Sequence, residues 1–130
     1  AVIVHDGRVV APGRNAVDSQ RRELAHAELA AIAAVEPFLF DHKRACTLYT
    51  SLEPCLMCYG AIVHYHFARL VVAAPDPTVG AFALAAPSPY FQRRGPAVTT
   101  GVGLAASQAL LADYVARTGG RAHLLPADRG

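Results

Sequence analysis

Apolar and polar residues recur with different periods along the chain, and each change of period marks an expected element. Residues 1–4 and 8–11 are short apolar runs rich in valine, joined through Asp6-Gly7, a pair typical of a tight β-hairpin turn. Residues 24–35 are rich in alanine, leucine and glutamate and end before a proline, which predicts a helix. Apolar positions cover most of its surface, so we expect it to be buried against a sheet.

The middle of the chain alternates strand and helix signals. Residues 45–50 predict a strand, and residues 55–67 predict a helix that is apolar nearly all round and therefore a core element. Pro54 suits the first position of this helix, where a backbone N–H is not needed. Residues 70–74 are an unbroken apolar run, as expected of a strand covered on both faces.

The last part of the chain is richer in turn-forming residues. Prolines and a glycine in residues 75–89 predict a loop, and residues 91–100 can hold one more strand. Residues 107–118 predict a helix with Ser107 as its N-cap and a glycine pair at its end. Residues 121–130 read as a loose tail.

The order of these elements predicts one α/β domain over residues 1–130. It is typical of a three-layer α/β/α architecture with a mixed sheet of about five strands. The length is enough to bury a core without disulfides. No run of about 18 apolar residues free of charge occurs, so we expect no membrane span. Because the chain opens on a strand, we also expect no signal peptide.

Two short motifs place metal-binding side chains and a carboxylate at the starts of two predicted helices. His26-Ala27-Glu28 opens the first helix, and Cys55 and Cys58 open the second. The two cysteines share a helix face, and a helix N-terminus favours their thiolate forms. Structural zinc sites usually have four protein ligands, whereas catalytic sites have three and leave one position to water. The motifs therefore predict a catalytic zinc held by His26, Cys55 and Cys58, with Glu28 as proton shuttle.

Each half of this pattern has another interpretation when taken alone. The cysteine pair could be a redox pair or half of a structural zinc site, whose fourth ligand could be Cys46, His64 or His66. We interpret these three as core or surface residues, since the histidines lie about two helical turns beyond Cys58. Glu28 follows His26 by two positions, so either the first helical turn is irregular or Glu28 reaches inward from the next face.

The cysteine content indicates the redox compartment of the protein, whereas its charge does not identify the substrate. The formal net charge of +2 comes without a broad basic tail, which excludes neither nucleic acid nor a small substrate. The chain has 3 cysteines, and the odd count favours metal binding in a reducing cytoplasm over disulfides.

With these motifs in place, the chain resembles the cytidine/deoxycytidylate deaminase superfamily of zinc-dependent enzymes over about residues 2–115. Its densest stretch, residues 48–62 (LYTSLEPCLMCYGAI), is similar to the branch of tRNA adenosine deaminases, guanine deaminases and fungal cytosine deaminases. The resemblance implies one Zn²⁺ per chain, Glu28 as the catalytic shuttle, and ammonia release from an amino-heterocycle. It further implies that the Asn15 side chain and the Ala27 backbone N–H bind substrate, and that the chain forms a homodimer.

The resemblance leaves the substrate open. The leading hypothesis is a small-molecule base or nucleoside, because residues 75–80 lack the arginine and lysine that tRNA enzymes often carry there, and phosphate contacts supply much of RNA affinity. Residues 90–95 resemble the corresponding segment of free-base cytosine deaminases. Residues 101–104 resemble that of the tRNA enzymes more closely. A tRNA wobble-adenosine deaminase is the alternative. A minor alternative is that the chain is a catalytically silent partner subunit, but such subunits typically lack the carboxylate that Glu28 provides.

Overall fold

One mixed five-stranded sheet organises the computed structural model, which describes residues 1–120. The strands are β1 (Val2–His5), β2 (Arg8–Pro12), β3 (Cys46–Leu52), β4 (Arg69–Ala74) and β5 (Ala97–Thr100). They lie in the order β2-β1-β3-β4-β5; β1 is antiparallel to β2 and β3, and β3, β4 and β5 run parallel. The predicted mixed sheet is confirmed, and the tail predicted at 121–130 lies outside the described residues.

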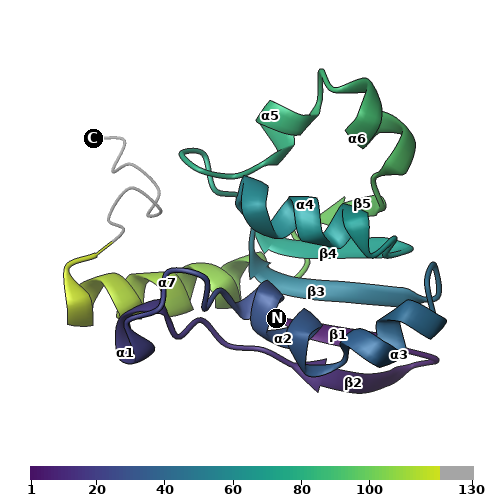
Figure 1. Ribbon diagram of the computed structural model, residues 1–130. Coiled ribbons are helices and arrows are strands. Elements are labelled where there is room, and N and C mark those ends of the chain that lie inside the picture. The colour runs from purple at the N-terminus through teal and green to yellow at the C-terminus, as the bar shows by residue number, and fades with distance from the viewer. Residues whose placement is uncertain (121–130) are drawn as a thin grey trace.

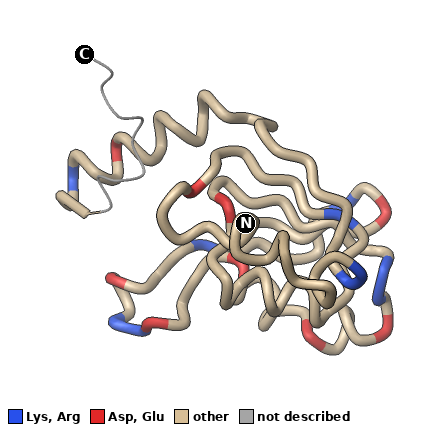
Figure 2. The backbone as a smooth tube through the Cα atoms, turned by 90° about the horizontal axis from the view of Figure 1, so that it is seen from above, with Lys and Arg blue, Asp and Glu red and all other residues tan. Residues whose placement is uncertain are grey.

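Helices cover both faces of this sheet. They are α1 (Val17–Gln20), α2 (Ala27–Ala34), α3 (Glu36–Asp41), α4 (Leu56–His64), α5 (Phe82–Ala85), α6 (Pro89–Arg94) and α7 (Leu104–Thr118). In Figure 1, α2, α3 and α4 lie in front of the sheet. Figure 2, seen from above, places α7 behind it. The three-layer α/β/α prediction is therefore confirmed. Within residues 1–120, no helix is both long and apolar enough to cross a membrane.

The core lies between the sheet and the front helices. Ile3, Leu48 and Leu70 are neighbours across β1, β3 and β4, are fully buried, and belong to one cluster with Ile62 of α4. Successive side chains of a strand point to opposite faces, and Tyr49, next to Leu48, is exposed. The hairpin prediction is also confirmed: the turn between β1 and β2 has positive φ at both central residues, as a type I′ turn requires.

Two prolines that were expected to end a helix or to lie in a loop instead lie at the starts of helices. Pro37 does not simply end a helix, because it occupies the first turn of α3, where a missing N–H costs nothing. Pro89 begins α6 in the same way, so the predicted loop over residues 75–89 contains α5 and the start of α6. Pro54, in contrast, precedes the N-cap of α4 and is not its first helical residue.

Two helices also begin elsewhere than predicted. The helix predicted from residue 24 starts at Ala27, because the Ala25 N–H bonds the Arg22 carbonyl in a turn and leaves His26 extended. The last helix starts at Leu104, with Gly103 as its N-cap. Ser107 is not its cap: it lies in the second turn, is buried, and donates its hydroxyl proton to the Ser51 carbonyl.

Candidate metal centre and active site

Three side chains from two helix starts converge at the carboxyl end of β3. The ligand atoms of His26, Cys55 and Cys58 all lie within 4.8 Å of one another, and Cys55 Sγ is 3.7 Å from His26 Nδ1. β3 ends at Leu52, so the loop into α4 delivers both cysteines to the strand end, where α/β proteins commonly place their sites. The sequence motifs therefore mark residues that the fold brings together.

The local backbone explains how a His-x-Glu motif can serve one site. His26 is the N-cap of α2 (φ −73°, ψ 149°) and Cys55 is the N-cap of α4 (φ −67°, ψ 168°), so both are extended. Neither side chain caps its own helix by a hydrogen bond, which leaves the imidazole and the thiol free for a shared partner. Glu28 lies in the first regular turn of α2. Of the two geometries left open above, the irregular helix start is the one observed.

Glu28 is buried and held in one orientation. It is 7% exposed, and Thr50 Oγ1 donates a 2.8 Å hydrogen bond to its Oε1 atom. Thr50 lies on the inward face of β3, so the strand and the helix fix the carboxylate between them. Sequence reasoning missed Thr50, although its inward position could be read from the alternation along β3.

A cavity of about 300 Å³ opens beside these groups. Of the candidate site residues, five line it: Asn15, His26, Ala27, Glu28 and Cys55. Cys58 is fully buried behind the wall. The Asn15 Oδ1 atom accepts the Val17 N–H at 3.2 Å, so this side chain both shapes the turn and presents its amide to the cavity.

The wall next to Cys55 depends on Glu53 and Gly80, which sequence reasoning also missed. Glu53 accepts hydrogen bonds from the Asp76 N–H at 3.1 Å and the Phe82 N–H at 2.9 Å. Gly80 pairs with Cys55 in an isolated β-bridge. A Cβ at position 80 would lie well inside 3.0 Å of the Asp76 carbonyl oxygen and the Glu53 carboxylate, so only glycine permits this approach. These contacts join the loop after β4 to the start of α4.

The same loop presents a buried carboxylate to the cavity. Asp76 is 3% exposed, lines the cavity, and accepts the N–H groups of Thr78 and Val79 at 3.0 and 3.1 Å through Oδ1. Nothing in its Pro-rich sequence context distinguished Asp76 from an ordinary turn residue.

The donor set fits zinc. Burial raises the pKa of the Cys58 thiol, and the neighbouring Glu28 and Cys55 raise it further. A site that disfavours a second negative charge in this way needs a cation before the thiolate can form, and zinc binds such sets of imidazole and thiolate. Within the described part of the chain, the metal-ligand group has these three members. Among residues 1–120, these three donors leave a fourth coordination position for water or substrate.

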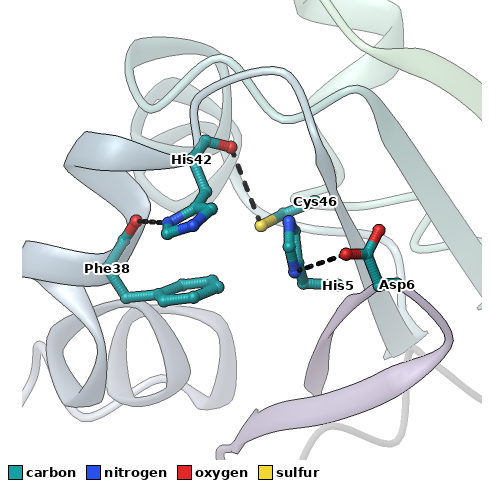
Figure 3. A network of polar contacts seen from close by, with 5 residues as sticks. All are labelled: His5, Asp6, Phe38, His42 and Cys46. Carbon is teal, nitrogen blue, oxygen red and sulfur yellow. Dashed lines mark hydrogen bonds and ion pairs between the residues drawn. The ribbon is translucent and has the colours of Figure 1, made fainter.

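The candidate fourth ligands lie apart from this group. Cys46 is buried at the opposite end of β3, with its thiol 4.0 Å from the His42 carbonyl oxygen (Figure 3). The His42 ring stacks on Phe38 with centroids 3.9 Å apart. His64 is exposed and His66 half-buried near the end of α4. All three candidates therefore occupy the core or surface positions expected of them.

Comparison with known proteins agrees with this geometry. The family model for the cytidine and deoxycytidylate deaminase zinc-binding region matches residues 1–74. A tRNA-specific adenosine deaminase of Buchnera aphidicola is 40% identical over 75 residues, which are 57% of this chain and 46% of that protein. A guanine deaminase of Bacillus subtilis is 48% identical over 63 residues, which are 48% of this chain and 40% of that protein. The chain thus spans less than half the length of each.

The matches to solved structures cover more of this chain than the sequence matches do. One from studies of A-to-I editing by tRNA:A34 deaminases has a TM-score of 0.74 and 33% identity, covering 84% of this chain and 81% of that chain. A guanine deaminase from Nitrosomonas europaea has a TM-score of 0.71 and 31% identity, covering 88% and 71%. The chain therefore belongs to the cytidine and deoxycytidylate deaminase zinc-binding family.

Proposed function

We propose that this chain is a zinc-dependent hydrolytic deaminase. It converts an exocyclic amine of a nucleobase, nucleoside or related amino-heterocycle to a carbonyl and releases ammonia. The observation that carries the proposal is the position of Glu28, a buried carboxylate fixed by Thr50 in the wall of the cavity, beside the group of three candidate metal donors.

The residues have distinct roles in this proposal. His26, Cys55 and Cys58 hold the zinc. Zinc, when bound, acts as a Lewis acid that makes a water molecule acidic near neutral pH. Glu28 would carry one proton of the attacking water to the ring nitrogen, and then the second proton, from the hydroxyl group now attached to the ring carbon, to the departing amine. The water oxygen becomes the product carbonyl, and the amine leaves as ammonia.

Asn15 and Ala27 orient the substrate. Ala27 is the first residue of α2, where backbone N–H groups have no intrahelical partner, so its N–H is available to a base in the cavity. The Asn15 NH₂ group can donate to a ring nitrogen or carbonyl, since its oxygen is engaged with Val17.

Two features support a small substrate over an RNA. The cavity volume of about 300 Å³ is at the lower end of the usual range for small-molecule sites. Its wall includes the carboxylates of Glu28, Glu53 and Asp76, whereas RNA binding relies on basic groups that contact phosphates. The relatives' names include both substrate classes, so a tRNA wobble-adenosine deaminase is the second candidate.

An ammonia-release screen tests the proposal. Zinc-loaded protein is assayed with cytosine, guanine, adenine, their nucleosides and an anticodon stem-loop, with inosine formation measured for the last. Glu28→Gln should lower kcat by about 10²- to 10⁴-fold at unchanged zinc content, the usual size of a general acid–base contribution. Ammonia release unaffected by Glu28→Gln would exclude this mechanism. No release from any of these compounds would favour the silent-subunit alternative.

We also propose that the protein is a cytoplasmic homodimer. Leu56 and Met57 at the start of α4 are 47% and 38% exposed, and a second copy of the chain packed on this helix would bury both side chains. The free cysteines at 46, 55 and 58 suit a reducing compartment. Light scattering of the wild type and of Leu56→Glu would test the dimer, which the substitution should dissociate.

A further inference from the structure

Helix α7 leaves the sheet and crosses to the cavity. Its Ser107 is the one buried residue of the helix and is bonded to the Ser51 carbonyl at the end of β3. Beyond this anchor, Leu110, Leu111, Tyr114 and Arg117 line the cavity that contains Glu28. The second half of α7 is therefore a wall of the site and contributes little to the core.

A second contact fixes the far part of α7. The Tyr114 hydroxyl donates a 2.9 Å hydrogen bond to Asp18 Oδ2, joining residues 96 positions apart. Asp18 lies in α1, the short helix just after Asn15. Figure 1 shows α7 passing beside α1. The helix is thus attached on both sides of the cavity, to β3 through Ser107 and to α1 through Tyr114.

The charges of this wall disfavour a phosphate group. Arg117 is the one arginine or lysine among the described residues that line the cavity. Its Nη2 and Nε atoms lie 2.8 and 3.0 Å from Asp113 Oδ2 on the same helix, so a carboxylate offsets part of its positive charge at the surface. Glu28, Glu53 and Asp76 add negative charge to the wall. An incoming phosphate would therefore meet a wall with three carboxylates and a single guanidinium, which repels it overall.

We propose that the Tyr114–Asp18 hydrogen bond holds α7 across the mouth of the cavity and makes Tyr114 a specificity-determining residue. It favours a compact, uncharged base over the corresponding 5′-monophosphate. Tyr114 meets the substrate directly, with Leu110 and Leu111 forming the apolar surface beside it, and Asp18 is the positioning residue that keeps the tyrosine in place. This inference rests on the proposed function and names the substrate class that the site accepts.

Tyr114→Phe and Asp18→Ala test the proposal in the zinc-loaded protein. Both remove the hydrogen bond, and Tyr114→Phe keeps the ring. Asp18→Asn retains an acceptor oxygen and should behave like the wild type. Tyr90→Phe is the matched control, because Tyr90 is exposed on α6 and does not line the cavity. For cytosine, guanine and adenine, kcat/KM is compared with that of each 5′-monophosphate, and amide hydrogen exchange is followed over residues 104–118.

The expected result is a fall in the base-to-monophosphate preference of about threefold to tenfold in Tyr114→Phe and Asp18→Ala, as expected for loss of one hydrogen bond. Exchange over residues 104–118 should accelerate in the same two variants and in neither control. Faster exchange with an unchanged preference would overturn the specificity role, and unchanged exchange would overturn the attachment itself. If the wild type releases no ammonia, the proposed function fails. The preference is then measured by equilibrium dialysis of guanine against its 5′-monophosphate, and an equal preference in wild type and Tyr114→Phe would reject the inference.

Discussion

Replacing Gly80 with alanine should disturb both the cavity wall and Cys55, the candidate metal ligand with which Gly80 pairs. The new methyl group would enter space occupied by the Asp76 carbonyl oxygen and the Glu53 carboxylate. The carbonyl belongs to the backbone, and Glu53 is fixed by two backbone N–H donors, so neither can move without losing a hydrogen bond. Overpacking costs about 1–3 kcal/mol and a hydrogen bond to a charged group about 1.5–3 kcal/mol. We expect Gly80→Ala to lower the free energy of unfolding by about 2–4 kcal/mol, allowing for partial relaxation.

Gly60→Ala is the matched control for this substitution. Position 60 lies inside α4, and a Cβ there meets no atom within 4 Å. The same chemical change should therefore stabilise the protein by about 1 kcal/mol through helix propensity. Urea unfolding followed by circular dichroism measures both, at two protein concentrations so that a change in association is seen separately.

The stabilisation of each variant by added zinc is a second way to distinguish them. Gly80 pairs with the backbone of Cys55, so Gly80→Ala should weaken metal binding, and the extra stability that zinc confers on the native state should shrink. Gly60→Ala should leave that increment unchanged. If Gly80→Ala stays within about 0.5 kcal/mol of the wild type, the size of an ordinary surface effect, the close approach described here is wrong.

Three further outcomes follow from the site. Thr50→Val removes the hydroxyl that holds Glu28 and should lower kcat about tenfold or more, with Thr50→Ser restoring it; equal kcat values would remove Thr50 from the mechanism. Zinc affinity should fall as pH falls, because the raised pKa of the Cys58 thiol means that a proton must leave before the thiolate binds metal. Competition with a chromophoric chelator at about pH 8 and pH 6 measures this, and a pH-independent affinity would contradict it. Cys46→Ala should leave one zinc per chain by elemental analysis, since Cys46 lies at the other end of β3; a loss of metal would restore it as a ligand.

The parts of the fold and site that local patterns specify were predictable. Asp6-Gly7 predicts its turn because few residue pairs accept two positive φ angles, and the apolar run after Arg69 predicts β4 because a buried parallel strand has no polar face. The metal donors were predictable because ligand type and spacing are set by the chemistry of zinc, whatever the surrounding fold.

The remaining site residues depend on contacts between distant segments. Thr50 meets Glu28 only because β3 runs under α2, and Glu53 meets Phe82 only because the loop after β4 returns to α4. Tyr114 reaches the cavity because α7 leaves the end of β5 in a particular direction, which no local pattern encodes. Pro37 and Pro89 were misjudged for a different reason: the same ring that ends one helix suits the first turn of the next.

The candidate metal donors and much of the cavity wall come from different parts of the sequence. The three candidate metal donors and Glu28 all lie between residues 26 and 58, within the stretch that matches the family model, residues 1–74. Asp76, Leu110 and Tyr114, which line the same cavity, all come later in the sequence. Mutations of Leu110 or Tyr114 can therefore reshape what the cavity admits without touching a candidate metal donor, whereas Gly80 is an exception because it pairs with Cys55. A directed-evolution library for a new substrate should therefore be concentrated on the second half of α7, whose side chains line the cavity and are not part of the core.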